Sequence, residues 1–170
     1  RAAASSRVER VVVATDDKRI AEAVRDFEGE AIMTSEKCHS GSDRIAEALN
    51  QVDCDLIVNI QGDEPMIAVD TIDRAIEAIL SDPKCHVSTA GVPIYEREEF
   101  ESPHAVKVVT DVRGYALYFS RSPLPNRTRT GPQAMRPGER PSWGLKHLGL
   151  YVYRRQALLD FVSWAPSPLE

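Results

Sequence analysis

Apolar runs and amphipathic stretches alternate along the first ninety residues, and this alternation restricts the fold more than any other feature. The runs rich in β-branched residues read as strands, and each is followed by a stretch with apolar positions at helical spacing. Such alternation predicts βαβ units and a mostly parallel sheet. The expected strands are 8–15, 30–34 and 56–61, and the expected helices are 17–27, 42–52 and 69–80.

The pattern changes after Pro83, where strand-like runs follow one another across short turns. Short turns between strands predict antiparallel pairing. We therefore predict an α/β fold with a mixed, mostly parallel sheet flanked by helices and a small antiparallel extension, in a single domain over residues 1–170. The later strands are expected at 87–92, 105–111, 115–120 and 146–153, and a last helix at 156–164.

Residues 120–144 are poor in apolar residues and rich in proline, arginine, threonine and glycine. A polar loop of this length inside a compact domain is a binding lid, a partner contact or a disordered segment. We expect a lid or a dimer contact.

Composition excludes some functions and leaves small-molecule chemistry open. The net charge of −5 argues against a nucleic-acid-binding surface, and no apolar run approaches the length of a membrane span. Cys38, Cys54 and Cys85 are widely spaced without a CxxC pair. Isolated cysteines fit neither a disulfide framework nor a zinc site, so we expect reduced thiols and a cytoplasmic protein.

Residues 56–65 read Leu-Ile-Val-Asn-Ile-Gln-Gly-Asp-Glu-Pro, an apolar run that stops at polar residues. We predict a buried parallel strand that delivers Gln61, Asp63 and Glu64 to the carboxyl edge of the sheet, where α/β proteins bind ligands. Asp63, after the permissive Gly62, would seat a divalent cation and its phosphates. The alternative is that the two acids simply begin a helix, with Pro65 in its first turn. The whole segment favours the ligand site.

A second cluster, Ser40-Gly41-Ser42-Asp43-Arg44, lies between a predicted strand and a predicted helix. Ser40 or Ser42 fits a helix cap. The backbone N–H groups at a helix start, together with Arg44, would also suit a phosphate or the edge of a base. These five residues by themselves favour the helix cap.

Two further clusters follow later in the chain. Arg121 directly follows a strand that we expect to neighbour the Asp63 strand. Its planar guanidinium would bind a carboxylate or a phosphate through two hydrogen bonds. Alternation along 146–153 places His147, Gly149 and Tyr151 on one face, which resembles a ligand seat. A lone histidine on a strand is more often structural.

Taken in order, these motifs resemble those of the 3-deoxy-manno-octulosonate (Kdo) cytidylyltransferase family, also called CMP-Kdo synthetases. The resemblance rests on the segments Ala-Thr-Asp-Asp, Ser-Gly-Ser-Asp-Arg, Asn-Ile-Gln-Gly-Asp-Glu-Pro, Phe-Ser-Arg-Ser-Pro-Leu-Pro, His-Leu-Gly-Leu-Tyr-Val-Tyr-Arg and Ser-Pro-Leu-Glu. The resemblance covers the chain from Val11 onward.

The resemblance implies a nucleotidyltransferase fold and the synthesis of CMP-Kdo and pyrophosphate from CTP and Kdo, for lipopolysaccharide assembly, in a cytoplasmic homodimer. It also implies roles for single residues. Asp63 would be a Mg²⁺ ligand and Gln61 would lie near both substrates. The CTP site would hold Ser40, Gly41, Arg44 and Gly62, and the sugar site would hold Arg121, His147 and Tyr151.

The chain differs from the family pattern at both ends and before Ser40. The family's Gly/Arg/Lys-rich first segment and its later Asp-Thr-x-Glu-Asp-Leu segment are not in the sequence, and Lys37-Cys38-His39 stands where the family commonly has Asp-His-Gln. We therefore expect a truncated portion of the enzyme, without appreciable synthesis as it stands. The alternatives are a non-catalytic binding or dimerisation fragment, and a cytidylyltransferase for another acidic sugar such as sialic acid.

Overall fold

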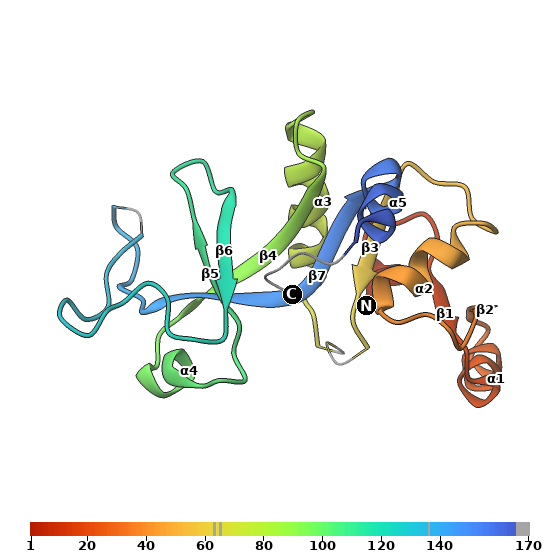
Figure 1. Ribbon diagram of the computed structural model, residues 1–170, viewed down its shortest axis with the longest axis horizontal. Coiled ribbons are helices and arrows are strands. Elements are labelled where there is room, and N and C mark those ends of the chain that lie inside the picture. Colours follow the sequence, from red (N-terminus) through yellow and green to blue (C-terminus); the bar gives the residue numbers. More distant parts are fainter. Residues whose placement is uncertain (63, 65, 136, 166–170) are drawn as a thin grey trace. The chain divides into compact units, whose positions relative to one another are not determined.

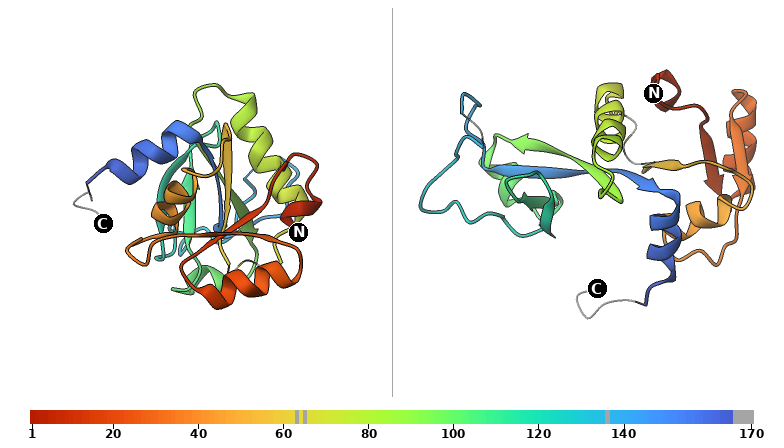
Figure 2. Two further views of the ribbon diagram at one scale, coloured as in Figure 1. Left: turned by 90° about the vertical axis from the view of Figure 1, so that its right-hand side faces the viewer. Right: turned by 90° about the horizontal axis from the view of Figure 1, so that it is seen from above.

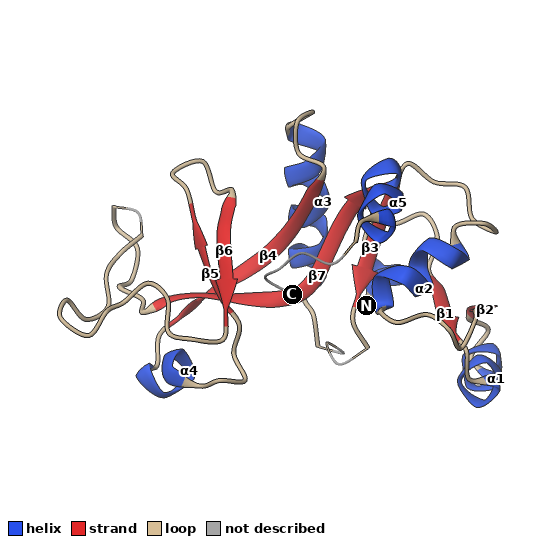
Figure 3. Cartoon of the chain, in the orientation of Figure 1, coloured by secondary structure: helices blue, strands red, loops and turns tan. Residues whose placement is uncertain are grey.

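A computed structural model describes residues 1–62, 64, 66–135 and 137–165 (Figure 1). The chain forms two compact units. The first unit contains residues 1–88 together with the segment from Leu150 onward, and the second contains Thr89–Gly149. The first unit is therefore built from two pieces of sequence that are separated by the second. Helices and strands alternate along the first piece, as predicted (Figure 3).

The first unit begins with a 3₁₀ turn, η1 (Ala2–Ala4), and a parallel pair of strands, β1 (Val12–Thr15) and β2 (Glu30–Met33). Helix α1 (Lys18–Asp26) connects these strands and packs on both, with Ala21 and Val24 buried. This is the βαβ unit that the alternation predicts. Strand β1 is shorter than the predicted 8–15, because pairing with β2 starts at Val12↔Glu30.

Helix α2 (Gly41–Ala48) follows β2 and contacts α5 (Arg155–Ser163). Strand β3 (Leu56–Ile60) pairs with the end of β7 (Gly144–Arg154), and the 13-residue α3 (Val69–Ser81) follows β3. Leu49, the C-cap of α2, forms a core cluster with Ile57 of β3, Tyr153 of β7 and Leu158 of α5. Helix α5 begins directly after β7, without a loop (Figure 2).

Two consecutive arginines at that junction bind the carboxyl ends of two helices. Arg154 donates to the backbone oxygen of Ile79, in the last turn of α3, at 2.9 Å and to that of Cys85, in the loop that follows, at 2.9 Å. Arg155 donates to the backbone oxygen of Leu49, the C-cap of α2, at 3.0 Å and to that of Val52, in the loop that follows, at 2.8 Å. The last carbonyls of a helix have no partner within it, and a cation there also complements the helix dipole.

The second unit is largely antiparallel. Strand β5 (Lys107–Thr110) pairs with β6 (Ala116–Ser120) and with the beginning of β7, both in antiparallel register. Strand β4 (Val87–Ile94) also pairs with β7. The five-residue helix α4 (Arg97–Glu101) was not predicted, because it has only Phe100 as a buried anchor and no helical period.

The α/β architecture with mixed strand directions and flanking helices is confirmed. The strands form two sheets, the parallel pair of β1 and β2 and a five-stranded sheet, and two details of the predicted pairing are wrong. Strand β3 was predicted to be parallel, whereas its pairing with β7 is antiparallel. A β-branched apolar run marks a covered strand whatever the direction of its neighbour, so the sequence could not distinguish the two. The Arg121 strand, β6, was predicted to neighbour the Asp63 strand, whereas β7 and β5 lie between β3 and β6 in the order of the sheet.

Residues 120–144 are not without structure. Gln133 and Ser142 form an antiparallel bridge, and Ser142 is buried. Trp143 donates its backbone N–H to Ile94 at 2.8 Å and stacks on Phe100 with ring centroids 5.8 Å apart. The end of the loop is thus fixed to the second unit. Its role as a lid or dimer contact stays a prediction.

Candidate functional site

In the first unit, the predicted nucleotide residues gather around the start of α2. Strands β1 and β2 end at Thr15 and Met33, and the next polar residues, Asp16 and Thr34, both contact Arg44 in the first turns of α2. Strand β3 ends at Ile60, and the side chain of Gln61 lies against Gly41. The structure therefore brings Ser40, Gly41, Arg44 and Gln61 together at the carboxyl ends of strands, the usual ligand edge of α/β folds.

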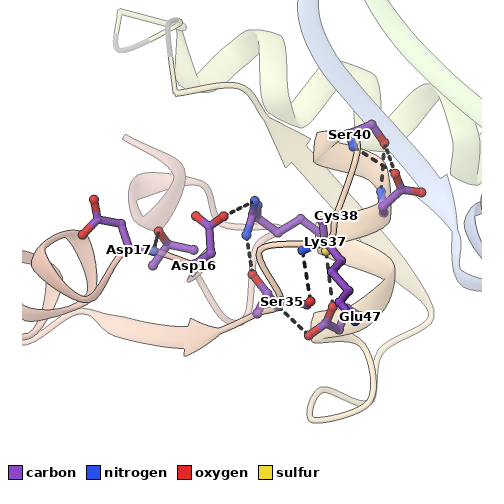
Figure 4. A network of polar contacts seen from close by, with 11 residues as sticks. Asp16, Asp17, Ser35, Lys37, Cys38, Ser40 and Glu47 are labelled. Carbon is purple, nitrogen blue, oxygen red and sulfur yellow. Dashed lines mark hydrogen bonds and ion pairs between the residues drawn. The ribbon is translucent and has the colours of Figure 1, made fainter.

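Ser40 is the N-cap of α2. Its hydroxyl accepts the Asp43 backbone N–H at 3.1 Å, and the Asp43 carboxylate accepts the Ser40 backbone N–H at 2.9 Å, which completes a capping box (Figure 4). The capping interpretation of Ser40 is confirmed, because both polar groups of the box are used within the helix start.

Gly41 lies beside the Gln61 side chain. A Cβ atom at residue 41 would lie 3.7 Å from both the Oε1 and Nε2 atoms of Gln61, which is ordinary van der Waals contact. Gln61 in turn donates from Nε2 to Oδ1 of Asn59 at 3.1 Å, and Asn59 is buried. The Gln61 amide is therefore oriented by β3 and placed beside the start of α2. Gly62 is exposed, and a Cβ atom at residue 62 would meet no atom of the described residues within 4 Å beyond its chain neighbours.

Tyr151 joins this region through the pairing of β3 with β7. It lies opposite Asn59 in the antiparallel register, so both side chains leave the same face of the sheet. Tyr151 also stacks on Tyr153 with ring centroids 5.9 Å apart. Burial raises the pKa of both phenols above the ordinary value, so each stays protonated at neutral pH.

Arg44 is held by two partners that the sequence reasoning did not single out. Its guanidinium donates to the Asp16 carboxylate at 2.9 Å and to the Thr34 hydroxyl at 2.6 Å. Figure 4 shows Asp16 at this end of the polar network. The sequence did contain a pattern that could have pointed to Asp16: the Ala-Thr-Asp-Asp segment places an acid directly after a predicted strand. Thr34 is the last residue of the predicted strand 30–34, whereas in the structure β2 ends at Met33.

One turn further along α2, Glu47 fixes the loop that leads into the helix. Its carboxylate accepts the Ser35 backbone N–H at 2.8 Å and the Cys38 thiol at 3.2 Å (Figure 4). Burial and the Glu47 charge both raise the pKa of Cys38. A thiol with a raised pKa is a poor nucleophile. All three cysteines are free thiols, and Cys38 has the environment of a structural one.

In the second unit, Arg121 binds backbone rather than side chains. Its guanidinium donates to the oxygens of Pro103 at 3.1 Å and His104 at 3.4 Å, in the loop between α4 and β5. Lys107, fully buried, donates to the flanking oxygens of Ser102 at 2.7 Å and Ala105 at 2.6 Å. Two cations thus hold four consecutive carbonyls. Burial first, and then the Arg121 charge, lowers the pKa of Lys107.

The same loop borders a hollow of about 530 Å³. Its lining includes Glu96, Glu98 and Glu99, and Lys146 forms an ion pair with Glu99. An acidic wall of this kind does not favour an acidic sugar. His147 lies on β7, where its Nε2 is 2.7 Å from the Thr89 hydroxyl and its ring meets Phe119 edge-on at 4.9 Å. The sugar-binding roles of Arg121, His147 and Tyr151 stay predictions.

Asp63, the predicted metal ligand, lies outside the described residues, as does Pro65. Among the residues that the structure describes, no three acidic, histidine or cysteine side chains gather into a possible metal site. Within the same residues, no helix is long and apolar enough to cross a membrane.

A family profile described as "Cytidylyltransferase" matches residues 1–170. The chain belongs to this cytidylyltransferase family. The cytidylyltransferase chain is 48% identical to a protein of Geobacter metallireducens and 45% identical to one of Geobacter sulfurreducens, both named 3-deoxy-manno-octulosonate cytidylyltransferase. Each comparison covers 100% of this chain, with 68% of the first relative and 69% of the second.

The fold of the cytidylyltransferase chain is also similar to a solved structure, described as CMP:2-keto-3-deoxy-manno-octonic acid synthetase complexed with CTP. The TM-score is 0.84 and the sequences are 39% identical. The similarity covers 98% of this chain and 65% of the solved one. The chain thus spans about two thirds of the length of the proteins it matches.

Proposed function

We propose that this chain is the larger part of an enzyme that transfers CMP from CTP to Kdo and releases pyrophosphate. The observation that carries the proposal is the likeness, over 98% of the chain, to a synthetase complexed with CTP. The geometry supports it, because Arg44, Gly41 and Gln61 meet at strand ends beside a helix start, where backbone N–H groups favour phosphates and other acceptors.

In the proposed reaction the anomeric hydroxyl of Kdo attacks the α-phosphorus of CTP and pyrophosphate leaves. The start of α2 and Arg44 would hold the nucleotide, and Gln61 would lie between the two substrates. Gln61 suits this place because Asn59 orients its amide and Asn59 lies opposite Tyr151, one of the predicted sugar-binding residues. Catalysis would come chiefly from positioning. Magnesium binding at Asp63 is a proposal drawn from the family resemblance.

The test compares the 170-residue chain with a version extended at both ends by the flanking residues of its own gene. Pyrophosphate release is measured with CTP, Mg²⁺ and either Kdo or sialic acid. We expect turnover with Kdo in the extended version only. Turnover with sialic acid alone would change the substrate, and an inactive extended version would favour the binding-fragment alternative.

We also propose that the enzyme is a cytoplasmic homodimer, with contacts from β6 and the loop 120–144 that follows it. Leu117, Tyr118 and Phe119 on β6 are 67%, 56% and 41% exposed, and apolar side chains gathered on a sheet edge are typical of an association surface. Sedimentation should give a dimer, and Leu117→Glu should give a monomer. Val112→Glu is the matched control, because Val112 is fully exposed at the tip of the same hairpin.

A further inference from the structure

Arg44 is a cation of the candidate nucleotide site that is held by two protein acceptors. It projects from α2 to the ends of two parallel strands, where Asp16 Oδ2 accepts at 2.9 Å and Thr34 Oγ1 accepts at 2.6 Å. The ends of these strands are themselves fixed, because the Thr34 backbone N–H donates to Thr15 at 2.9 Å and both threonines are buried. The two acceptors therefore hold the guanidinium in one place.

The pair remains accessible to a ligand. The side chains of Arg44 and Asp16 are 21% and 35% exposed, so neither is sealed in the core. A guanidinium has five N–H donors in a fixed fork, and the two bonds to Asp16 and Thr34 occupy different nitrogen atoms. The fork can thus keep its protein partners and still donate to a nucleotide.

We propose that Asp16 is a positioning residue for nucleotide binding, which acts by holding the Arg44 guanidinium in its binding orientation. The inference rests on the proposed function, since it assumes that Arg44 meets CTP. A side chain as long as arginine loses rotamer freedom when it binds a ligand, and a partner that orders it beforehand removes part of that loss. Asp16 itself need not touch the nucleotide.

The test is a double-mutant cycle in the extended protein, with Asp16→Asn, Arg44→Gln and the two together. We expect Asp16→Asn to raise the KM for CTP about three- to tenfold, with kcat and the KM for the sugar changed less than twofold. In the Arg44→Gln background, Asp16→Asn should change the KM for CTP by less than a factor of two, because the residue it orients is already gone.

Two further variants separate positioning from a general effect on folding. Asp17→Asn is the matched control, because Asp17 is the neighbouring acid and binds Arg19 rather than Arg44. It should leave the KM for CTP unchanged. Asp16→Glu should recover part of the loss, since it restores the charge that Arg44 binds. Thermal unfolding should show Asp16→Asn and Asp17→Asn within a few degrees of the unmodified protein.

Several results would overturn the inference. Equal effects of Asp16→Asn in both backgrounds would mean that Asp16 does not act through Arg44. A lower KM for CTP in Asp16→Asn would mean that Asp16 competes with the nucleotide for the guanidinium. If Arg44→Gln raises the KM while Asp16→Asn does not, only this inference fails. If Arg44→Gln has no effect, or calorimetry detects no CTP binding to the unmodified protein, the proposed nucleotide site fails with it.

Discussion

The start of α2 in the first unit and the loop before β5 in the second are both organised by cations, but the acceptors differ in kind. Arg44 binds side chains, Asp16 and Thr34, whereas Lys107 and Arg121 bind backbone oxygens of residues 102–105. A side-chain acceptor can be changed by one substitution, but a carbonyl cannot. In the first region, a single substitution can therefore change either the cation or its acceptor, whereas in the second it can change only the cation.

The largest expected effect is in the second region. Lys107→Met keeps most of the buried side-chain volume but removes the donor to Ser102 and Ala105. Buried carbonyls without a partner are costly, and we expect the free energy of unfolding to fall by about 2 kcal/mol in urea titrations. Lys84→Met, at an exposed lysine, is the control and should change it by less than about 0.5 kcal/mol. An equal fall in the free energy of unfolding in both variants would show that Lys107 does not stabilise the loop.

The next effect concerns the cap of α2. Ser40→Ala removes the acceptor for the Asp43 backbone N–H, and we expect a loss of about 1 kcal/mol in the free energy of unfolding. Ser40→Asn keeps an acceptor at the cap and should cost only a few tenths of a kcal/mol. A Ser40→Ala variant as stable as the unmodified chain would show that the helix start is held by Arg44 and Glu47 alone.

A smaller effect would separate stability from ligand binding at the same helix. Gly41→Ala places a Cβ atom in ordinary contact with Gln61, and alanine is a better helix former than glycine. We expect stability to rise by about 0.5 kcal/mol while the KM for CTP rises several-fold, because the added methyl group occupies the approach to the helix start. An unchanged KM for CTP would indicate that the nucleotide does not bind beside Gly41.

The smallest effect is a pH dependence within the first unit. Burial raises the pKa of Tyr153 in the folded chain above its value in the unfolded chain, which is about 10. Its contribution to stability is therefore complete below pH 10 and is lost as the pH rises through the raised pKa. Tyr153→Phe should make the free energy of unfolding fall less steeply above pH 10. Tyr118→Phe, at an exposed tyrosine, should keep the original slope.

The sequence was sufficient to locate most elements, because covered strands and amphipathic helices must carry their apolar residues at fixed periods. Helices α1, α2, α3 and α5 and the strands β1 to β7 of the described residues lie where the periods predict them, within a few residues at the ends. Strand direction could not be predicted for β3. Its partner, β7, lies some ninety residues further along the chain, and no local pattern records that pairing.

The candidate site was predictable where its residues are close together in the sequence, and not where the fold brings distant residues together. Ser40, Gly41 and Arg44 lie within five residues of sequence, and their cluster is visible without a structure. The partners that give Arg44 its orientation, Asp16 and Thr34, are 28 and 10 residues away. They become neighbours only because β1 and β2 are parallel and end side by side. Gln61 was predicted at a strand end, but its contact with Gly41 required the fold.

The junction of β7 and α5 has a consequence for how the chain is made. Arg155 satisfies carbonyls of Leu49 and Val52, which precede it by 106 and 103 residues, and β3 obtains its pairing from the same late segment. A ribosome adding about 5–20 residues per second would need roughly 5–20 seconds to pass from one segment to the other. Throughout that interval the nascent chain would present an incomplete β3 edge and an uncapped end of α2, so we expect this to be its most vulnerable period for aggregation.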